Sequence, residues 1–235
     1  MIRNKYKIIN QVKSIILKYA NPERIYFYGS QENGEAKKDS DIDIAYDDLE
    51  CNNHSFILDE INKIETLSKI DIKNIAKSNE RFKTRVKSTG RVIFSATKKL
   101  RAEDSLINFN KAFNKFAEIV KRRDEFINDG LEDIYLDIIV KRFEFTYEMS
   151  WKSLKRYLEY LGFSPKSPRE SFKEGFAQGL IVDEVVWLNM IEQRNLSAHI
   201  YDVSEILGIL EQLTDFRIAF ESLTEEIKKG LYENR

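Results

Sequence analysis

The sequence predicts two domains of different class, an N-terminal α/β domain built on a small mixed sheet and a C-terminal all-α helical bundle. Up to about residue 97, short apolar runs alternate with stretches of helical periodicity. Beyond residue 103, apolar residues recur only at helical spacing. A chain of 235 residues can hold two small domains. We therefore expect domains at 1–97 and 103–235, joined by a polar linker at 98–102.

The N-terminal domain is expected to alternate helices with strands. Apolar residues from Ile8 to Tyr19 repeat at helical spacing, and Asn21-Pro22 ends that helix. Short apolar runs bounded by turn residues predict the strands. The expected order is helix 6–19, strands 24–28 and 41–46, helix 55–67, strand 69–76, helix 79–87 and strand 91–95.

The C-terminal domain is expected to be an up-and-down bundle of four main helices and a short one. One apolar stripe covers 107–120, and a longer stripe covers 134–161 until Gly162 ends its helix. Ser167-Pro168 then places an N-cap before a proline at the first helical position. Further helices are predicted over 168–177, 183–198 and 204–229.

Composition indicates a globular protein of the reducing cytoplasm. The chain is 42% hydrophobic and 33% charged, and no run reaches the length of a membrane-spanning helix. The single cysteine, Cys51, excludes an internal disulfide framework. The net charge of −1 points to neither DNA nor a membrane as partner.

Two motifs in the N-terminal domain indicate nucleoside triphosphate chemistry. Gly29-Ser30 follows an apolar run, and Asp41 and Asp43 follow ten residues later. Alternation along a strand puts these two carboxylates on one face, where they repel each other unless a cation lies between them. Mg²⁺ meets that demand when it also binds substrate phosphates. Glycine lets the backbone approach a phosphate closely, and serine offers a hydroxyl and an N–H.

This pattern resembles the nucleotidyltransferase superfamily of the DNA polymerase β type, and within it the minimal, MntA-like nucleotidyltransferases. The resemblance covers roughly residues 1–97 and implies a third carboxylate, for which Asp71 is well placed. It implies that Asp41, Asp43 and Asp71 are catalytic and hold Mg²⁺ in a two-metal site. ATP is then the expected substrate, with AMP as the transferred group.

The resemblance also implies that Gly29, Ser30 and Ser40 contact the nucleotide. Minimal nucleotidyltransferases commonly carry arginines just after Gly-Ser, whereas this chain has Gln31-Glu32-Asn33 there. Lys37 and Lys38 are the candidates that could supply positive charge to the triphosphate instead.

A second polar segment lies in the bundle and contains Arg194, His199 and Tyr201 within eight residues. Arg194 and His199 are five residues apart, about 140° round an ideal helix, so they cooperate only across a helix end or between two chains. An arginine can hold a phosphate and a histidine can shuttle protons. Such a pair can cleave RNA without a metal, because the 2′-hydroxyl of the RNA itself acts as the nucleophile.

The spacing Arg, four residues, His, one residue, Tyr resembles the motif of HEPN domains. Residues of about 103–230 resemble the helical partners of minimal nucleotidyltransferases, some of which are substrate-binding subunits and others HepT-type toxins. The resemblance implies that Arg194 and His199 form a ribonuclease pair in a shared cleft of a homodimer. It also implies that Tyr201 is the acceptor of AMP, so that a toxin and its antitoxin are joined in one chain.

Three hypotheses follow. In the first, the protein modifies its own ribonuclease domain. In the second, the helical domain binds a small substrate, as in aminoglycoside nucleotidyltransferases. This hypothesis predicts a deep acidic pocket between the domains, to which acids such as Glu144, Glu148 and Glu192 could contribute. In the third, both sites have decayed and the chain is an interaction module, as the absence of arginines after Ser30 would favour.

Overall fold

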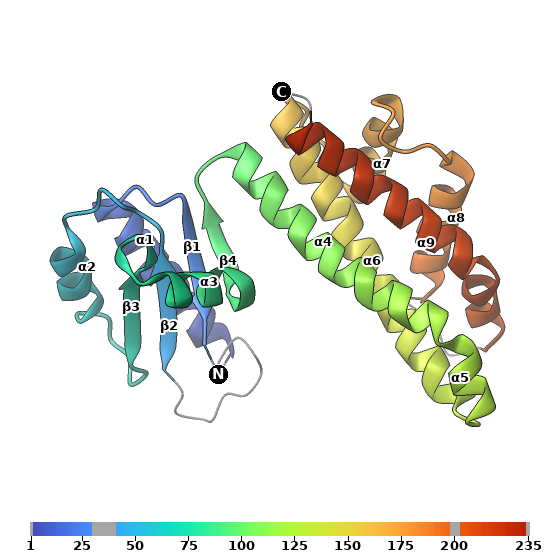
Figure 1. Ribbon diagram of the computed structural model, residues 1–235, viewed down its shortest axis with the longest axis horizontal. Helices are drawn as coiled ribbons and strands as arrows, with labels where there is room; N and C mark the ends of the chain where they lie inside the picture. Colours follow the sequence, from blue (N-terminus) through green and yellow to red (C-terminus); the bar gives the residue numbers. More distant parts are fainter. Residues whose placement is uncertain (1, 30–40, 198–202, 234–235) are drawn as a thin grey trace. The chain divides into compact units, whose positions relative to one another are not determined.

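The computed structural model describes residues 2–29, 41–197 and 203–233. The chain divides into two compact units, residues 1–100 and 101–235, which are considered separately (Figure 1). Within the described residues, no helix is both long enough and apolar enough to span a membrane.

The N-terminal unit contains a four-stranded mixed sheet in the order β3-β2-β1-β4 (Figure 1). Its central strand β1 pairs antiparallel with both β2 and β4, whereas β2 and β3 run parallel. The mixed sheet predicted from the sequence is therefore confirmed. The strands are β1 (Arg24–Tyr28), β2 (Ile42–Tyr46), β3 (Ile70–Asn74) and β4 (Arg91–Ser95).

Each face of this sheet packs against different helices. Residues of α1 (Ile2–Tyr19) and α2 (His54–Ile61) form the larger apolar core with Phe27, Ile42 and Ile44. On the other face, α3 (Glu80–Thr89) and the 3₁₀ helix η1 (Ile75–Lys77) pack against Tyr26, Tyr28 and Ala45. Because side chains alternate along β2, Asp41 and Asp43 lie on the same face as Ala45, which α3 covers.

Two predicted elements of this unit were too long. The helix predicted over 55–67 ends at Ile61, where backbone N–H groups turn to carbonyls three residues back, as Ile64 does to Ile61. Leu67 is fully exposed, so no packing holds further helical turns. The strand predicted over 69–76 ends at Asn74, whose side chain accepts a hydrogen bond from the Ala76 N–H and starts η1.

The C-terminal unit is all helical, as predicted. Gly162 ends the long helix in the left-handed region, with φ of 104°. Ser167 Oγ accepts the Glu170 N–H at 3.2 Å, and Pro168 occupies the first helical position. The helices are α4 (Lys98–Lys121), α5 (Arg123–Asn128), α6 (Glu132–Leu161), α7 (Pro168–Ala177), α8 (Glu184–Ser197) and α9 (Val203–Tyr232).

The prediction of a linker at 98–102 was wrong, because these residues form the first turns of α4. The Thr97 hydroxyl accepts a hydrogen bond from the Leu100 N–H at 3.2 Å and so starts the helix. Ala102 is completely buried within the apolar core of the helical unit. The polar composition of this segment belongs to a helix with one buried side and one solvated side.

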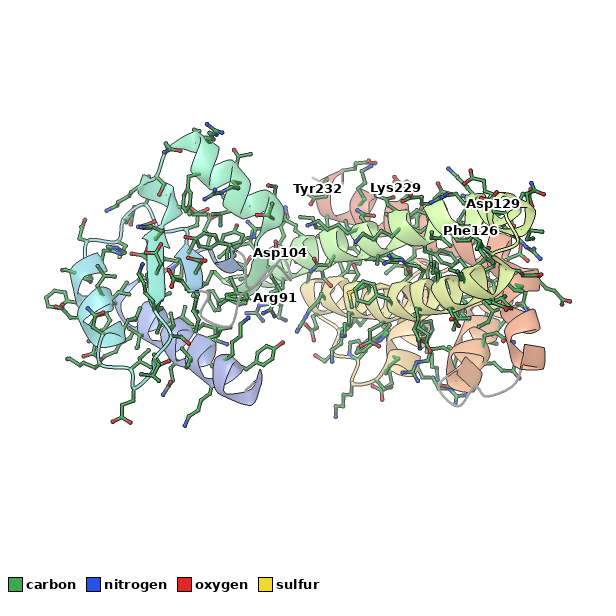
Figure 2. All side chains as sticks on the ribbon, turned by 90° about the horizontal axis from the view of Figure 1, so that it is seen from below. Arg91, Asp104, Phe126, Asp129, Lys229 and Tyr232 are labelled. Carbon is green, nitrogen blue, oxygen red and sulfur yellow. The ribbon has the colours of Figure 1, made fainter. Side chains whose placement is uncertain are left out.

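An aromatic cluster centred on Phe220 holds the bundle together. The Phe220 ring of α9 meets Phe109 and Phe116 of α4 edge-on, and the Trp187 ring of α8 edge-on at 5.7 Å. Figure 2 shows Lys229 and Tyr232 where α9 ends, at the opposite end of the bundle from Phe126 and Asp129. The bundle is therefore a single packed core rather than a set of loosely associated helices.

We expect Phe220→Ala to lower the free energy of unfolding of the helical unit by about 3–5 kcal/mol, because it empties a fully buried site. Both tryptophans, Trp151 and Trp187, lie in this unit, so urea unfolding followed by tryptophan fluorescence reports on it. The control is Phe145→Ala on α6, where the ring is 51% exposed and the expected loss is below about 0.5 kcal/mol. Equal losses in the two variants would contradict the described core.

Candidate functional site

The sheet brings two of the predicted aspartates side by side. Asp43 of β2 pairs in register with Asp71 of the parallel strand β3. On its other side, Asp43 pairs with Tyr28 at the end of β1. Side chains directly opposite one another on paired strands share a face, and Asp41 precedes Asp43 by two residues on that face. Three carboxylates and one phenol therefore gather at one end of the sheet.

Gly29 follows β1 directly and allows the chain to turn beside Asp43. Its φ of 86° lies in the left-handed region, which side chains other than glycine rarely adopt. A Cβ atom built at this position would collide with the Asp43 carboxylate. The glycine is therefore required both by the turn and by the closeness of the backbone to the acidic group.

Partial burial and repulsion within this group raise the pKa of Asp43. Partial burial is the largest cause, and the charges of Asp71 and Asp41 add to it, while Lys69 and Arg85 oppose the increase. The pKa of the Tyr28 phenol is also raised, first by burial and then by Asp71 and Asp43. Negative charge is thus concentrated here and incompletely compensated.

Two lysines partly balance the outer aspartates. Lys69 Nζ lies 3.4 Å from Asp41, and Lys73 Nζ lies 3.3 Å from Asp71. Both lysines are more than half exposed, so each ion pair contributes little, roughly 0–1 kcal/mol. Asp43 has no ion pair among the described residues, which leaves the central carboxylate open to another cation.

The donor set suits a magnesium ion that is completed by substrate. Within the described parts of the chain, no three His, Cys, Asp or Glu side chains converge tightly enough to hold a metal by themselves. Mg²⁺ commonly takes only one or two carboxylates and fills its remaining positions with water and substrate phosphates. Asp43 and Asp71, paired in register, can supply those carboxylates, with Asp41 beside them.

Several residues predicted from the sequence lie outside the described residues. These are Ser30, Lys37, Lys38 and Ser40 of the expected nucleotide site, together with His199 and Tyr201 of the second motif. The described members of the two predicted sites are Gly29, Asp41, Asp43, Asp71 and Arg194.

Arg194 lines a cavity of about 730 Å³ within the helical unit. Apolar side chains such as Leu188 and Ile191 form part of its wall, and Glu148, Glu192 and Arg169 add charge. This volume is typical of a small-molecule site, roughly 300–1,000 Å³. Of the acids predicted for a pocket between the domains, Glu148 and Glu192 line this cavity within the helical unit, whereas Glu144 does not line it and pairs with Lys141. The lining residues are Tyr147, Glu148, Trp151, Ser167, Pro168, Arg169, Leu188, Ile191, Glu192, Arg194 and Asn195.

The charge of Arg194 acts on two residues of this cavity. Burial raises the pKa of the Tyr147 phenol to about 12, although Arg194 opposes the shift. Burial would raise the pKa of Glu148, but hydrogen bonds from Lys152 and Trp151 and the charges of Lys152 and Arg194 hold it below its usual value. Glu148 is therefore ionised at neutral pH, and the cavity presents charges of both signs.

Several residues of these sites were not predicted, among them Arg85, Trp151 and Arg169. Arg85 of α3 acts on the acidic group, and Trp151 and Arg169 line the helical cavity. For Arg85, the sequence offered one signal: Phe82 and Arg85 are one helical turn apart, beside the buried Val86. The other two come together only through the packing of α6 against α7, which sequence periodicity does not specify.

Each unit is similar to a known protein family. Residues 104–229, more than half of the chain, match the family described as nucleotidyltransferase substrate binding protein like. Residues 10–99 match the family described as polymerase beta, nucleotidyltransferase. A Haemophilus influenzae protein described as a probable ribonuclease HepT is 27% identical over 104 residues, which cover 42% of this chain and 71% of that protein.

Two solved structures are similar to part of the chain. One is a Haemophilus influenzae protein described as showing the fold of a substrate binding domain of a nucleotidyltransferase. It is 26% identical, covers 52% of this chain and 98% of its own, and has a TM-score of 0.48. A Thermus thermophilus protein is 28% identical over 53% of this chain and 98% of its own, with a TM-score of 0.42.

We expect Asp43→Asn to stabilise the N-terminal unit at pH 7, by about 2 °C in melting temperature, because it removes a partly buried charge and its repulsion from the neighbouring carboxylates. The pKa of Asp43 is raised in the folded state, so its destabilising effect is present above that pKa and disappears below about pH 4, where the acid is protonated. Scanning calorimetry at both pH values measures the difference in melting temperature. Because both tryptophans lie in the helical unit, the transition that does not change tryptophan fluorescence is assigned to the N-terminal unit.

The matched control for this prediction is Asp47→Asn. Asp47 follows the other end of β2 and pairs with Lys87 at 2.7 Å, so its loss should lower the melting temperature at pH 7. If Asp43→Asn were to destabilise the unit as Asp47→Asn does, the repulsion inferred for the acidic group would be wrong.

Proposed function

The chain belongs to the family of nucleotidyltransferase substrate-binding-like proteins. From this premise, we propose that the protein is a Mg²⁺-dependent nucleotidyltransferase that transfers AMP from ATP to a hydroxyl group. The polymerase β-type nucleotidyltransferase domain at residues 10–99 supports the reaction class. The observation that carries the proposal is the register of Asp43 with Asp71, with Gly29 turning directly beside Asp43.

The proposed reaction is an in-line displacement. The acceptor oxygen attacks the α-phosphorus of the nucleoside triphosphate, and the bond from that phosphorus to the bridging oxygen breaks as the new bond forms. Pyrophosphate leaves with the electron pair of the broken bond. Mg²⁺ held by Asp41, Asp43 and Asp71 would neutralise the charge on the phosphates. Asp71 either takes part in that binding or accepts the hydroxyl proton, and Gly29 allows the phosphates to approach the backbone.

The proposed acceptor is Tyr201 of the protein's own helical unit. There Arg194 and His199 form a metal-independent ribonuclease pair in a homodimer, and AMP on the neighbouring tyrosine would silence it. Support comes from the similarity to a protein described as a probable ribonuclease HepT and from the place of Arg194 in the wall of a cavity. In this form the chain joins a toxin and its antitoxin.

Incubation with Mg²⁺ and ATP should add the mass of one AMP to the protein, and peptide mass spectrometry should map it to Tyr201. Asp43→Asn should slow the transfer at least about 100-fold, because it removes a carboxylate that stabilises charge at the reacting phosphate. Asp47 follows the same strand but lies away from the site, so Asp47→Asn should leave the rate of AMP transfer within about twofold. Transfer that persists in Asp43→Asn would contradict the proposed site, whereas transfer that persists in Tyr201→Phe would contradict only the acceptor.

A second candidate function is nucleotide transfer to a small cationic substrate. The helical cavity supports it, because about 730 Å³ of space carries Glu148 and Glu192 beside Arg169 and Arg194, and Glu148 is held ionised. This candidate predicts that the protein nucleotidylates an added aminoglycoside and that Glu148→Gln abolishes this transfer. If neither the protein nor an added substrate is modified and no nucleoside triphosphate binds, the chain is better described as an interaction module.

A further inference from the structure

Three cationic side chains lie near the acidic face, and they differ in their partners. Lys69 and Lys73 each form an ion pair, with Asp41 and Asp71 respectively. Arg85 projects from α3, is exposed, and forms no ion pair with any described residue. Its guanidinium is therefore the one of these three groups that is not already paired with a site carboxylate in the described part of the chain.

Two aromatic rings connect Arg85 to the acidic group. The guanidinium lies over the Phe82 ring, 5.2 Å from its centre. Phe82 in turn meets the Tyr28 ring edge-on at 5.7 Å, and Tyr28 pairs in register with Asp43. A planar guanidinium is well suited to such stacking, and the stack fixes its position while leaving its N–H donors for a ligand.

The charge of Arg85 also reaches the acidic group electrostatically. It acts to lower the pKa of both Asp43 and Tyr28, although burial and the neighbouring carboxylates outweigh it. Arg81, one turn earlier on the same helix, is not among the groups that act on either residue. Of the two exposed arginines on α3, only Arg85 is near the reacting end of the sheet.

The segment after Ser30 leaves a chemical gap that Arg85 can fill. Its first three residues are Gln31, Glu32 and Asn33, none of which is cationic, and its two lysines, Lys37 and Lys38, come only near its end. Aspartates and Mg²⁺ bind one side of a triphosphate, and the remaining phosphate oxygens need cationic donors. A guanidinium binds two phosphate oxygens at once through parallel N–H donors, which a lysine ammonium cannot do.

We propose that Arg85 binds the terminal phosphates of the nucleoside triphosphate, so that the cation comes from α3 rather than from the loop after Gly29-Ser30. The inference rests on the proposed nucleotidyltransferase function and names the residue that selects a triphosphate over a monophosphate. Binding of the leaving pyrophosphate group also assists its departure, because the negative charge that develops there is neutralised.

Isothermal titration calorimetry on the full chain tests this proposal with Mg²⁺-ATP and with AMP. Binding at the acidic site is identified as the part lost in Gly29→Ala, whose Cβ atom would collide with the Asp43 carboxylate. Arg85→Gln should weaken Mg²⁺-ATP binding there by about tenfold or more and leave AMP binding within about twofold. Arg85→Lys, which keeps the charge but not the paired donors, should give an intermediate loss.

Arg81→Gln is the matched control, because it removes the same charge from the same helix and should leave Mg²⁺-ATP binding within about twofold. If Arg85→Gln binds ATP as the wild type does, the proposal for Arg85 is overturned while the proposed function stands. If Arg85→Gln weakens ATP and AMP equally, Arg85 only supports the packing of Phe82 and the proposal is overturned. If the wild type binds no nucleotide at the acidic site, the proposed function fails and this inference fails with it.

Discussion

Repulsion among like charges held in register is the constraint on which the N-terminal unit depends. Parallel pairing of β2 and β3 sets Asp43 opposite Asp71, and the turn at Gly29 brings the backbone against the same carboxylate. Placing like charges this close costs free energy of folding, which a separation of these groups would avoid. This cost of placing three carboxylates at one end of a packed sheet is the reason for which we propose that a cation and an anionic substrate complete the site.

The apolar packing of both units places polar groups at a few defined positions. In the sheet, α1 and α2 cover one face, and the carboxylates lie on the face that packs against α3. In the bundle, the aromatic cluster around Phe220 fixes the long helices, and the packing of α7 and α8 beside α6 leaves a cavity that contains Arg194. The two units therefore differ in the polar groups that they present: three carboxylates at one end of the sheet, and a cavity with charges of both signs in the bundle.

Much of the fold could be predicted from the sequence, because its signals are local. Gly162, Ser167 and Pro168 mark helix ends by their own backbone preferences, and alternation along β2 placed Asp41 and Asp43 on one face. The failures have a common cause, since they concern segments whose state depends on packing. The polar composition of residues 98–102 predicted a linker, yet Ala102 is buried in the bundle. Arg85 and Trp151 become part of their sites only through contacts between secondary-structure elements. The roles predicted for Ser30, His199 and Tyr201 stay predictions.

The central claim is that a divalent cation relieves the repulsion among the three aspartates, and a carboxyl-carbon NMR titration of ¹³C-labelled aspartate tests it most directly. Assignment by Asp43→Asn identifies the Asp43 signal in the full chain. Without Mg²⁺ the pKa of Asp43 should be raised above its ordinary value, and with Mg²⁺ and a non-hydrolysable ATP analogue it should fall below that value. A pKa that is unchanged by the metal and the analogue would contradict the account, because the acidic group would then be a feature of the fold and not a metal site.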